Sequence, residues 1–167
     1  MSRMLEQAFH DVDVEKIFVR PSYYFSNWLG YMETVKQYGV LPSFFPEQLP
    51  VEMHSPIDLA KFIAKIMADK PPIKDHHIYE LVGPEKYSAM DVANAFSKML
   101  HKKVVVQSVP KENWKETLVS VGFTENTASN LAAMTQAVID HKTEPERPGD
   151  TIKLATSLQA YLEEYAR

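Results

Sequence analysis

Segments with the pattern of buried β-strands alternate with segments of helical periodicity, and this alternation restricts the fold more than any other feature of the chain. Short runs rich in β-branched and aromatic residues predict strands or extended segments at residues 15–20, 51–54, 77–83 and 104–109. Apolar residues at helical spacing predict helices at residues 2–10, 24–38, 55–70, 88–101, 110–121, 125–141 and 157–167. This order is typical of the α/β class, so we expect a small, mostly parallel sheet with many helices.

Hydroxyl residues and glycines mark the ends of several of these helices. Ser88 followed by Asp91 has the spacing of a capping box, and Ser55 followed by a proline is a typical helix start. Gly39 predicts the end of the helix before it. Residues 40–50 are rich in proline and phenylalanine and have no period, so we predict a loop or flap there.

The composition argues against several classes of protein. The chain has 167 residues, enough for one domain, and its net charge of −4 comes with scattered cations rather than a basic stripe for nucleic acid. The longest apolar runs are too short to span a membrane. The absence of cysteine excludes disulfides, thiolate nucleophiles and cysteine-based zinc sites. We therefore expect a cytoplasmic protein that binds neither nucleic acid nor a membrane.

Five segments carry a resemblance to a known family. They include a strand ending in Arg20-Pro21 that runs into an aromatic turn, an Asp-Leu-Ala helix start and a Gly-Pro strand end, and they lie at residues 17–28, 55–60, 79–84, 87–93 and 109–114. In this order they resemble the C-terminal portion of NmrA-like proteins, which are atypical members of the short-chain dehydrogenase/reductase superfamily. The resemblance implies the C-terminal part of a Rossmann-like fold and a family NAD(P) cofactor.

Two motifs of such proteins do not occur in this sequence. The five glycines are too far apart to form a glycine-rich phosphate loop, and no tyrosine has a lysine four residues later. We therefore expect the nucleotide-binding half of the family fold to lie outside this chain, so that NAD(P) binding depends on a completing half. We divide the chain into an NmrA-like C-terminal region at 1–141, a linker at 142–150 and a helical tail of the same domain at 151–167.

The resemblance assigns candidate site residues to the turn after the first strand. In relatives this turn passes the nicotinamide end of the cofactor, which implies cofactor contacts from Pro21, Ser22, Tyr23 and Asn27. The aromatic residues next to it and in the following loop would line the substrate pocket, with the loop as its lid: Tyr24, Phe25, Trp28, Phe44 and Phe45. No catalytic residue can be assigned from the sequence.

Structural roles compete with each of these assignments. Arg20 can be an ion-paired residue at a buried strand end, and aromatic residues at helical spacing are more often core than pocket. His54 beside Asp58 has the spacing of a base and its orienter, although a carboxylate at a helix start is also explained by the helix dipole. The adjacent His76 and His77 point to opposite faces of a strand, so we predict no metal site.

Two functions remain open at this stage. The first is a truncated NAD(P)-dependent oxidoreductase that would reduce a quinone-like or other small electrophile when completed by a nucleotide-binding half. The alternative is a non-catalytic protein that binds a small molecule or senses a dinucleotide. In either case half a doubly wound sheet would leave strand edges exposed, which predicts self-association or a partner chain.

Overall fold

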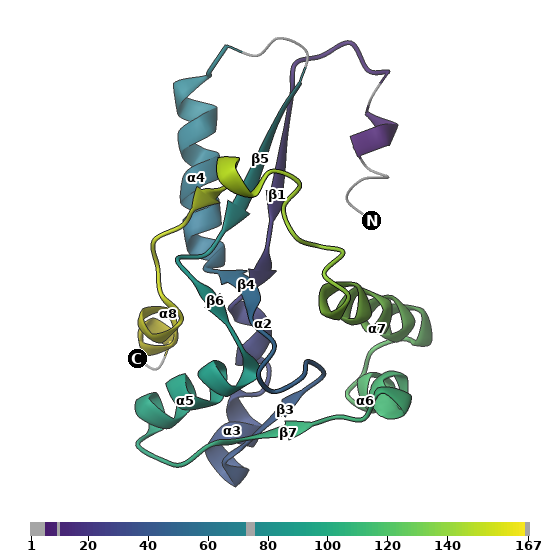
Figure 1. The fold of residues 1–167 in the computed structure, drawn as a ribbon, viewed down its shortest axis with the longest axis vertical. Helices are drawn as coiled ribbons and strands as arrows, with labels where there is room; N and C mark the ends of the chain where they lie inside the picture. Colours follow the sequence, from purple (N-terminus) through teal and green to yellow (C-terminus); the bar gives the residue numbers. More distant parts are fainter. Residues whose placement is uncertain (1–5, 10, 73–75, 166–167) are drawn as a thin grey trace.

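The computed structural model describes residues 6–9, 11–72 and 76–165, and it confirms the α/β class (Figure 1). Within these residues the strands form three small sheets, ordered β1-β5-β8, β2-β4-β6 and β3-β7. All the pairs are parallel except the antiparallel pair between β4 and β6. The helix predicted at residues 2–10 falls partly outside the described residues, and residues 6–8 are helical.

The first sheet contains the two longest strands and is covered on one side by one long helix. β1 (Lys16–Pro21) pairs with β5 (His76–Val82), whose carboxyl end pairs with the short β8 (Ile152–Lys153). Helix α4 (Pro56–Asp69) begins as predicted, because the Ser55 hydroxyl accepts a hydrogen bond from the Ile57 N–H. No residue of α4 is buried, so much of its apolar face is left uncovered.

The second sheet positions the turn that follows β1. It joins β2 (Tyr23–Tyr24), β4 (Val51–His54) and β6 (Lys86–Tyr87). The single helix predicted at 24–38 is wrong, because the structure has α2 (Ser26–Leu29) and α3 (Met32–Tyr38), separated at Gly30 and Tyr31. Gly39 ends α3 in the left-handed conformation, as predicted.

The third sheet corrects the loop predicted at 40–50. Val40–Ser43 forms β3, which pairs in parallel with β7 (Val105–Ser108) despite its proline. A two-stranded pair of this kind tolerates proline because each strand keeps one free edge. The remaining residues of the segment connect β3 to β4, and Phe45 is buried in the core.

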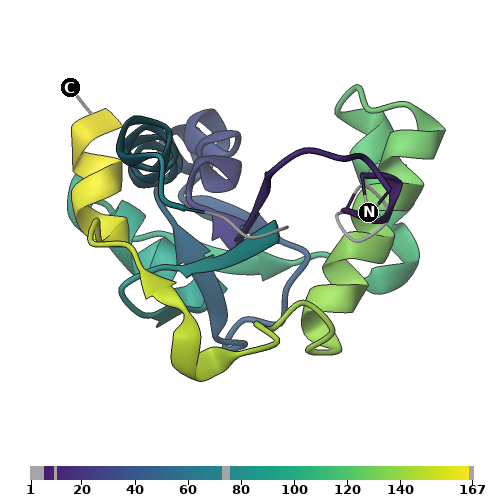
Figure 2. The same ribbon diagram turned by 90° about the horizontal axis from the view of Figure 1, so that it is seen from above.

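Helices α5 and α8 pack on one side of these sheets, and α6 and α7 lie on the other (Figure 2). α5 (Ala89–Leu100) has the predicted capping box, in which Ser88 and Asp91 bond to each other's backbone N–H. α6 (Trp114–Ser120) follows a 3-10 turn at Lys111–Asn113, and α7 (Glu125–Ile139) is capped by Thr124 as predicted.

The C-terminal segments return to the sheets. A 3-10 turn at Pro148–Asp150 leads into β8, and α8 (Leu158–Tyr165) packs its buried Leu158, Tyr161 and Leu162 against α5. The buried core is therefore centred on α5, α8 and the second sheet, whereas the outer parts of β1, β5 and α4 contain few buried residues.

Candidate functional site

A serine and a histidine from different strands meet where β1 and β4 end. Ser22 follows the last residue of β1, and its Oγ lies 3.0 Å from Nδ1 of His54, the last residue of β4. The backbone holds both residues in place, because the Ser22 N–H donates to the Leu81 carbonyl and the Phe25 N–H donates to the His54 carbonyl. Ligands of open α/β sheets bind at the carboxyl ends of parallel strands, so this location suits a binding site.

The His54 side chain is fully buried, with 0% of its surface exposed. Its Nε2 has no hydrogen-bond partner among the described residues, although Nδ1 is paired. Burial lowers the pKa of His54 to about 4, against a smaller opposing effect of the Asp58 carboxylate. The Asp58 carboxylate accepts hydrogen bonds from the N–H and hydroxyl of Thr156, so Asp58 does not orient the imidazole. The lowered pKa of His54 favours the neutral imidazole at pH 7.

Tyr23 follows Ser22 in the same turn and contacts a different set of residues. Burial raises the pKa of Tyr23 to about 12, although a hydrogen bond from the Asn27 side chain partly offsets this rise. The Tyr23 ring makes edge contacts with Phe45 and Trp28, at centroid distances of 5.3 and 6.2 Å. The turn is therefore fixed by packing on this side and by the Ser22–His54 contact on the other.

An apolar cavity of about 200 Å³ lies next to the carboxyl ends of β3 and β7. No charged side chain contributes to its wall, which is formed by Ser43, Phe44, Phe45, Pro46, Ser108, Val109, Trp114 and Ile139. Trp114 is held there by its Nε1–H, which donates to the Val109 carbonyl at 2.8 Å, and by an edge contact with Phe44. The wall is therefore mostly apolar and carries no charge, which suits a small neutral group better than a charged one.

The structure separates the residues that were assigned to one substrate pocket. Phe44 and Phe45 line the cavity, whereas Tyr24 packs against the His54 ring at a centroid distance of 4.9 Å. Phe25 is fully buried against Tyr87 and Tyr161, and the Trp28 Nε1–H points at the Met53 sulfur. The assignment of these residues to a pocket stays a prediction.

The structure limits which atoms of the predicted cofactor contacts can reach a ligand. Pro21, Ser22 and Tyr23 are consecutive, and Asn27 follows on α2 with an exposed side chain. The Ser22 N–H donates to the Leu81 carbonyl and the Ser22 hydroxyl contacts His54 Nδ1, which leaves the Ser22 carbonyl for a ligand. The sequence did not indicate the Ser22–His54 contact or the role of Trp114 in the cavity wall, because each pairing depends on how separate strands converge.

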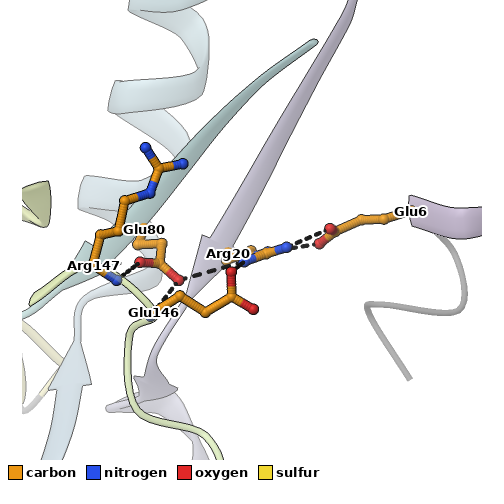
Figure 3. Close-up of polar contacts among 5 residues, drawn as sticks. All are labelled: Glu6, Arg20, Glu80, Glu146 and Arg147. Atoms are coloured by element: carbon orange, nitrogen blue, oxygen red, sulfur yellow. Dashed lines mark hydrogen bonds and ion pairs between the residues drawn. The ribbon is translucent and has the colours of Figure 1, made fainter. Parts of the chain in front are cut away.

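Arg20 has the structural role that its position suggested. Its guanidinium bonds both carboxylate oxygens of Glu6, at 2.8 and 2.6 Å, and lies 3.0 Å from Glu146 and 3.5 Å from Glu80 (Figure 3). The Glu80 carboxylate also accepts hydrogen bonds from the N–H groups of Glu146 and Arg147. This cluster, Glu6-Arg20-Glu80-Glu146, ties the predicted linker to β1 and β5.

Among the described residues, no group of three or more His, Asp or Glu side chains is placed to hold a metal ion. None of the described helices combines the length and the apolar character that crossing a membrane requires.

Comparison with known proteins identifies one family and several solved structures with a similar fold. The model of the NmrA-like family matches residues 6–166. No curated protein matches the chain. An NADPH-dependent quinone oxidoreductase from Escherichia coli is similar with a TM-score of 0.80 at 17% identity, over 99% of this chain and 60% of that one. A triphenylmethane reductase from Citrobacter sp., complexed with NADP(H), is similar with a TM-score of 0.73 at 21% identity, over 97% of this chain and 56% of that one. The chain thus spans about 60% of the length of these structures.

Proposed function

This chain belongs to the NmrA-like family, and we propose that it forms the substrate-side portion of an NAD(P)-dependent oxidoreductase that reduces a quinone-like small electrophile. The observation that carries the proposal is the aromatic-lined cavity at the carboxyl ends of β3 and β7. Activity would require a nucleotide-binding unit, because this sequence contains no glycine-rich phosphate loop. Bound NAD(P)H would supply the hydride.

The cavity favours a substrate with one uncharged ring. Its volume of about 200 Å³ is small for a drug-sized ligand. Apolar protein cavities of ~150 Å³ nevertheless bind a single benzene ring. Phe44 and Trp114 present aromatic surfaces on which a flat ring can pack, and Ser43 and Ser108 are the polar side chains of the wall. A single-ring quinone meets these requirements of size and charge.

The edge of β1 supports completion by a second unit. Among the described residues β1 pairs only with β5, so its other edge has no strand beside it. Parallel sheets are normally covered on both faces, yet Met67 of α4 is 71% exposed and no β1 residue is buried. A unit that adds a parallel strand to β1 and covers α4 would bury both surfaces.

A chimera tests the oxidoreductase activity. The part of the E. coli quinone oxidoreductase that this chain does not match would be fused to the chain, and NADPH oxidation would be followed with duroquinone as acceptor. We expect turnover that depends on quinone and falls about tenfold when Trp114 is replaced by Ala. Replacement of exposed Val121 by Ala is the matched control and should leave turnover unchanged.

Titration of the isolated chain separates binding from catalysis. We expect duroquinone to quench tryptophan fluorescence, and we expect neither NADPH nor NADH to raise the melting temperature without the nucleotide-binding unit. A folded chimera that binds duroquinone and NADPH but transfers no hydride would contradict the enzyme and support a binding or sensing protein. Failure of duroquinone to bind to both the isolated chain and the chimera would contradict a quinone-like substrate.

A further inference from the structure

The Nε2 atom of His54 is buried and has no hydrogen-bond partner in the described part of the chain. A buried polar atom without a partner destabilises a fold, and an apolar residue at this position would avoid that effect. Burial in this part of β4 does not require a polar residue, because the preceding residue, Met53, is equally buried and apolar. The histidine therefore calls for an explanation beyond packing.

The donor in the Ser22–His54 contact depends on which imidazole nitrogen carries the proton. Ser22 Oγ and His54 Nδ1 are 3.0 Å apart, and no other described side chain or carbonyl accepts the Ser22 hydroxyl proton. The hydroxyl is satisfied within the protein only by donating to Nδ1. In the tautomer in which the hydroxyl donates to Nδ1, the neutral imidazole carries its hydrogen on Nε2, and that atom is a buried donor in need of an acceptor.

Tyr24 is the neighbour of His54 on the adjacent strand. It packs against the imidazole with ring centroids 4.9 Å apart, and the Tyr24 side chain is itself only partly buried. Tyr24 and His54 are paired residues of β2 and β4, so both lie at the same strand ends as Ser22. A ligand whose oxygen reached the edge of the imidazole, in the plane of the ring, would supply the acceptor that Nε2 lacks.

We propose that the His54 Nε2–H donates a hydrogen bond to a carbonyl oxygen borne by the ring of a bound ligand, and that Ser22 fixes the imidazole for this role. The proposal rests on the proposed function, because that function supplies two rings of this kind: the nicotinamide with its carboxamide and the quinone. The neutral surroundings suit such an oxygen, since the nearby Asp58 carboxylate is bound to Thr156.

Nitrogen NMR of the chimera labelled with ¹⁵N-histidine tests the contact directly, because the isolated chain is not expected to bind the cofactor. Nicotinamide mononucleotide and duroquinone would be titrated separately, and the Nε2 resonance of His54 would be followed. A shift with the mononucleotide alone assigns the contact to the cofactor, and a shift with duroquinone alone assigns it to the substrate. No shift of Nε2 with either probe would overturn the proposal.

Variants separate this role from a structural one. In His54→Asn the amide occupies the position of Nδ1, so the Ser22 contact is kept and Nε2 is lost. We expect His54→Asn to bind the active probe about tenfold more weakly without a lower melting temperature, and exposed His141→Asn to bind as the wild type does. Equal affinities for His54→Asn and the wild type would overturn the proposal. An Nε2 shift together with an inactive chimera would contradict the proposed oxidoreductase function and still support the His54 contact.

Discussion

At the scale of single residues, the buried His54 makes the stability of the fold depend on pH. Its pKa falls from 6.5 to about 4 on folding because burial disfavours the charged ring. The unfolded chain therefore binds this proton more readily, and stability is lost as the pH falls below 6.5 until it levels off near 4. At about 1.4 kcal/mol per pKa unit, the loss amounts to roughly 3 kcal/mol.

We predict that His54→Leu removes this part of the pH dependence. Urea unfolding of the variant between pH 7 and pH 4 should give a flatter curve of unfolding free energy than the wild type. Exposed His141→Leu provides the control and should follow the wild-type curve. Parallel curves for the wild type and His54→Leu would mean that His54 does not resist protonation in the folded protein.

Arg20 holds three carboxylates together, so its removal should destabilise the protein most at neutral pH. Burial alone would raise the pKa of Glu80, but the N–H groups of Glu146 and Arg147 and the Arg20 guanidinium lower it overall. Glu80 thus stabilises the fold above its unfolded pKa, and this contribution disappears as the pH falls through the folded pKa.

We predict that Arg20→Met lowers the unfolding free energy by about 1–3 kcal/mol at pH 7, with a smaller loss near pH 3, because Glu80 loses its charge as the pH falls. Arg147→Met is the matched control, because its guanidinium points away from the cluster in Figure 3 and only its backbone N–H takes part. An equal loss at both pH values would show that Arg20 acts through packing of its aliphatic part.

At the scale of elements, a glycine allows β4 to pass close to the end of β5. A Cβ atom added to Gly83 would lie 1.8 Å from the Met53 carbonyl oxygen, so the two backbones would have to separate. We predict that Gly83→Ala destabilises the protein by about 3 kcal/mol or more, measured by thermal or urea unfolding. Gly149→Ala is the control, since a Cβ there meets no atom within 4 Å. Comparable stability of the two variants would contradict the close approach.

The elements that the sequence predicts correctly are those with strong local signals. Caps at Ser55, Ser88 and Thr124 gave correct helix starts because each depends on residues two or three positions away. The strand at 40–43 was missed because its neighbour β7 lies more than sixty positions later, and pairing at that distance leaves no local periodicity. The prediction of one helix at 24–38 missed the break at Gly30 because the helical spacing of apolar residues continues across it.

The candidate site was predictable only in part for the same physical reason. The turn at Ser22 and the aromatic residues Phe44 and Phe45 could be singled out from sequence and resemblance. The contact between Ser22 and His54 spans 32 positions, and it exists because β1 and β4 end side by side. Trp114 reaches the cavity through the pairing of β3 with β7, which the sequence did not reveal.

At the scale of the whole molecule, the free edge of β1 should govern association. The N–H groups of a strand alternate between its two edges, and the Ser22 N–H faces β5 by donating to Leu81. The N–H groups of Ile17 and Val19 therefore face the edge that has no partner among the described strands. Exposed edges of this kind pair with other chains unless they are covered.

We predict that the isolated chain self-associates through this edge as its concentration rises, and that Val19→Pro weakens the association. Proline removes the outward N–H while leaving the N–H groups that face β5 in place. Val19→Thr keeps the outward N–H and is the matched control. Sedimentation velocity over a hundredfold range of concentration measures the effect, with circular dichroism to verify that each variant is folded.

If the chain completes its sheet by pairing at β1, a nucleotide-binding unit that docks there should also dissociate the self-associated form. Association unchanged in folded Val19→Pro would place the contact elsewhere, with the uncovered apolar face of α4 as the next surface to test.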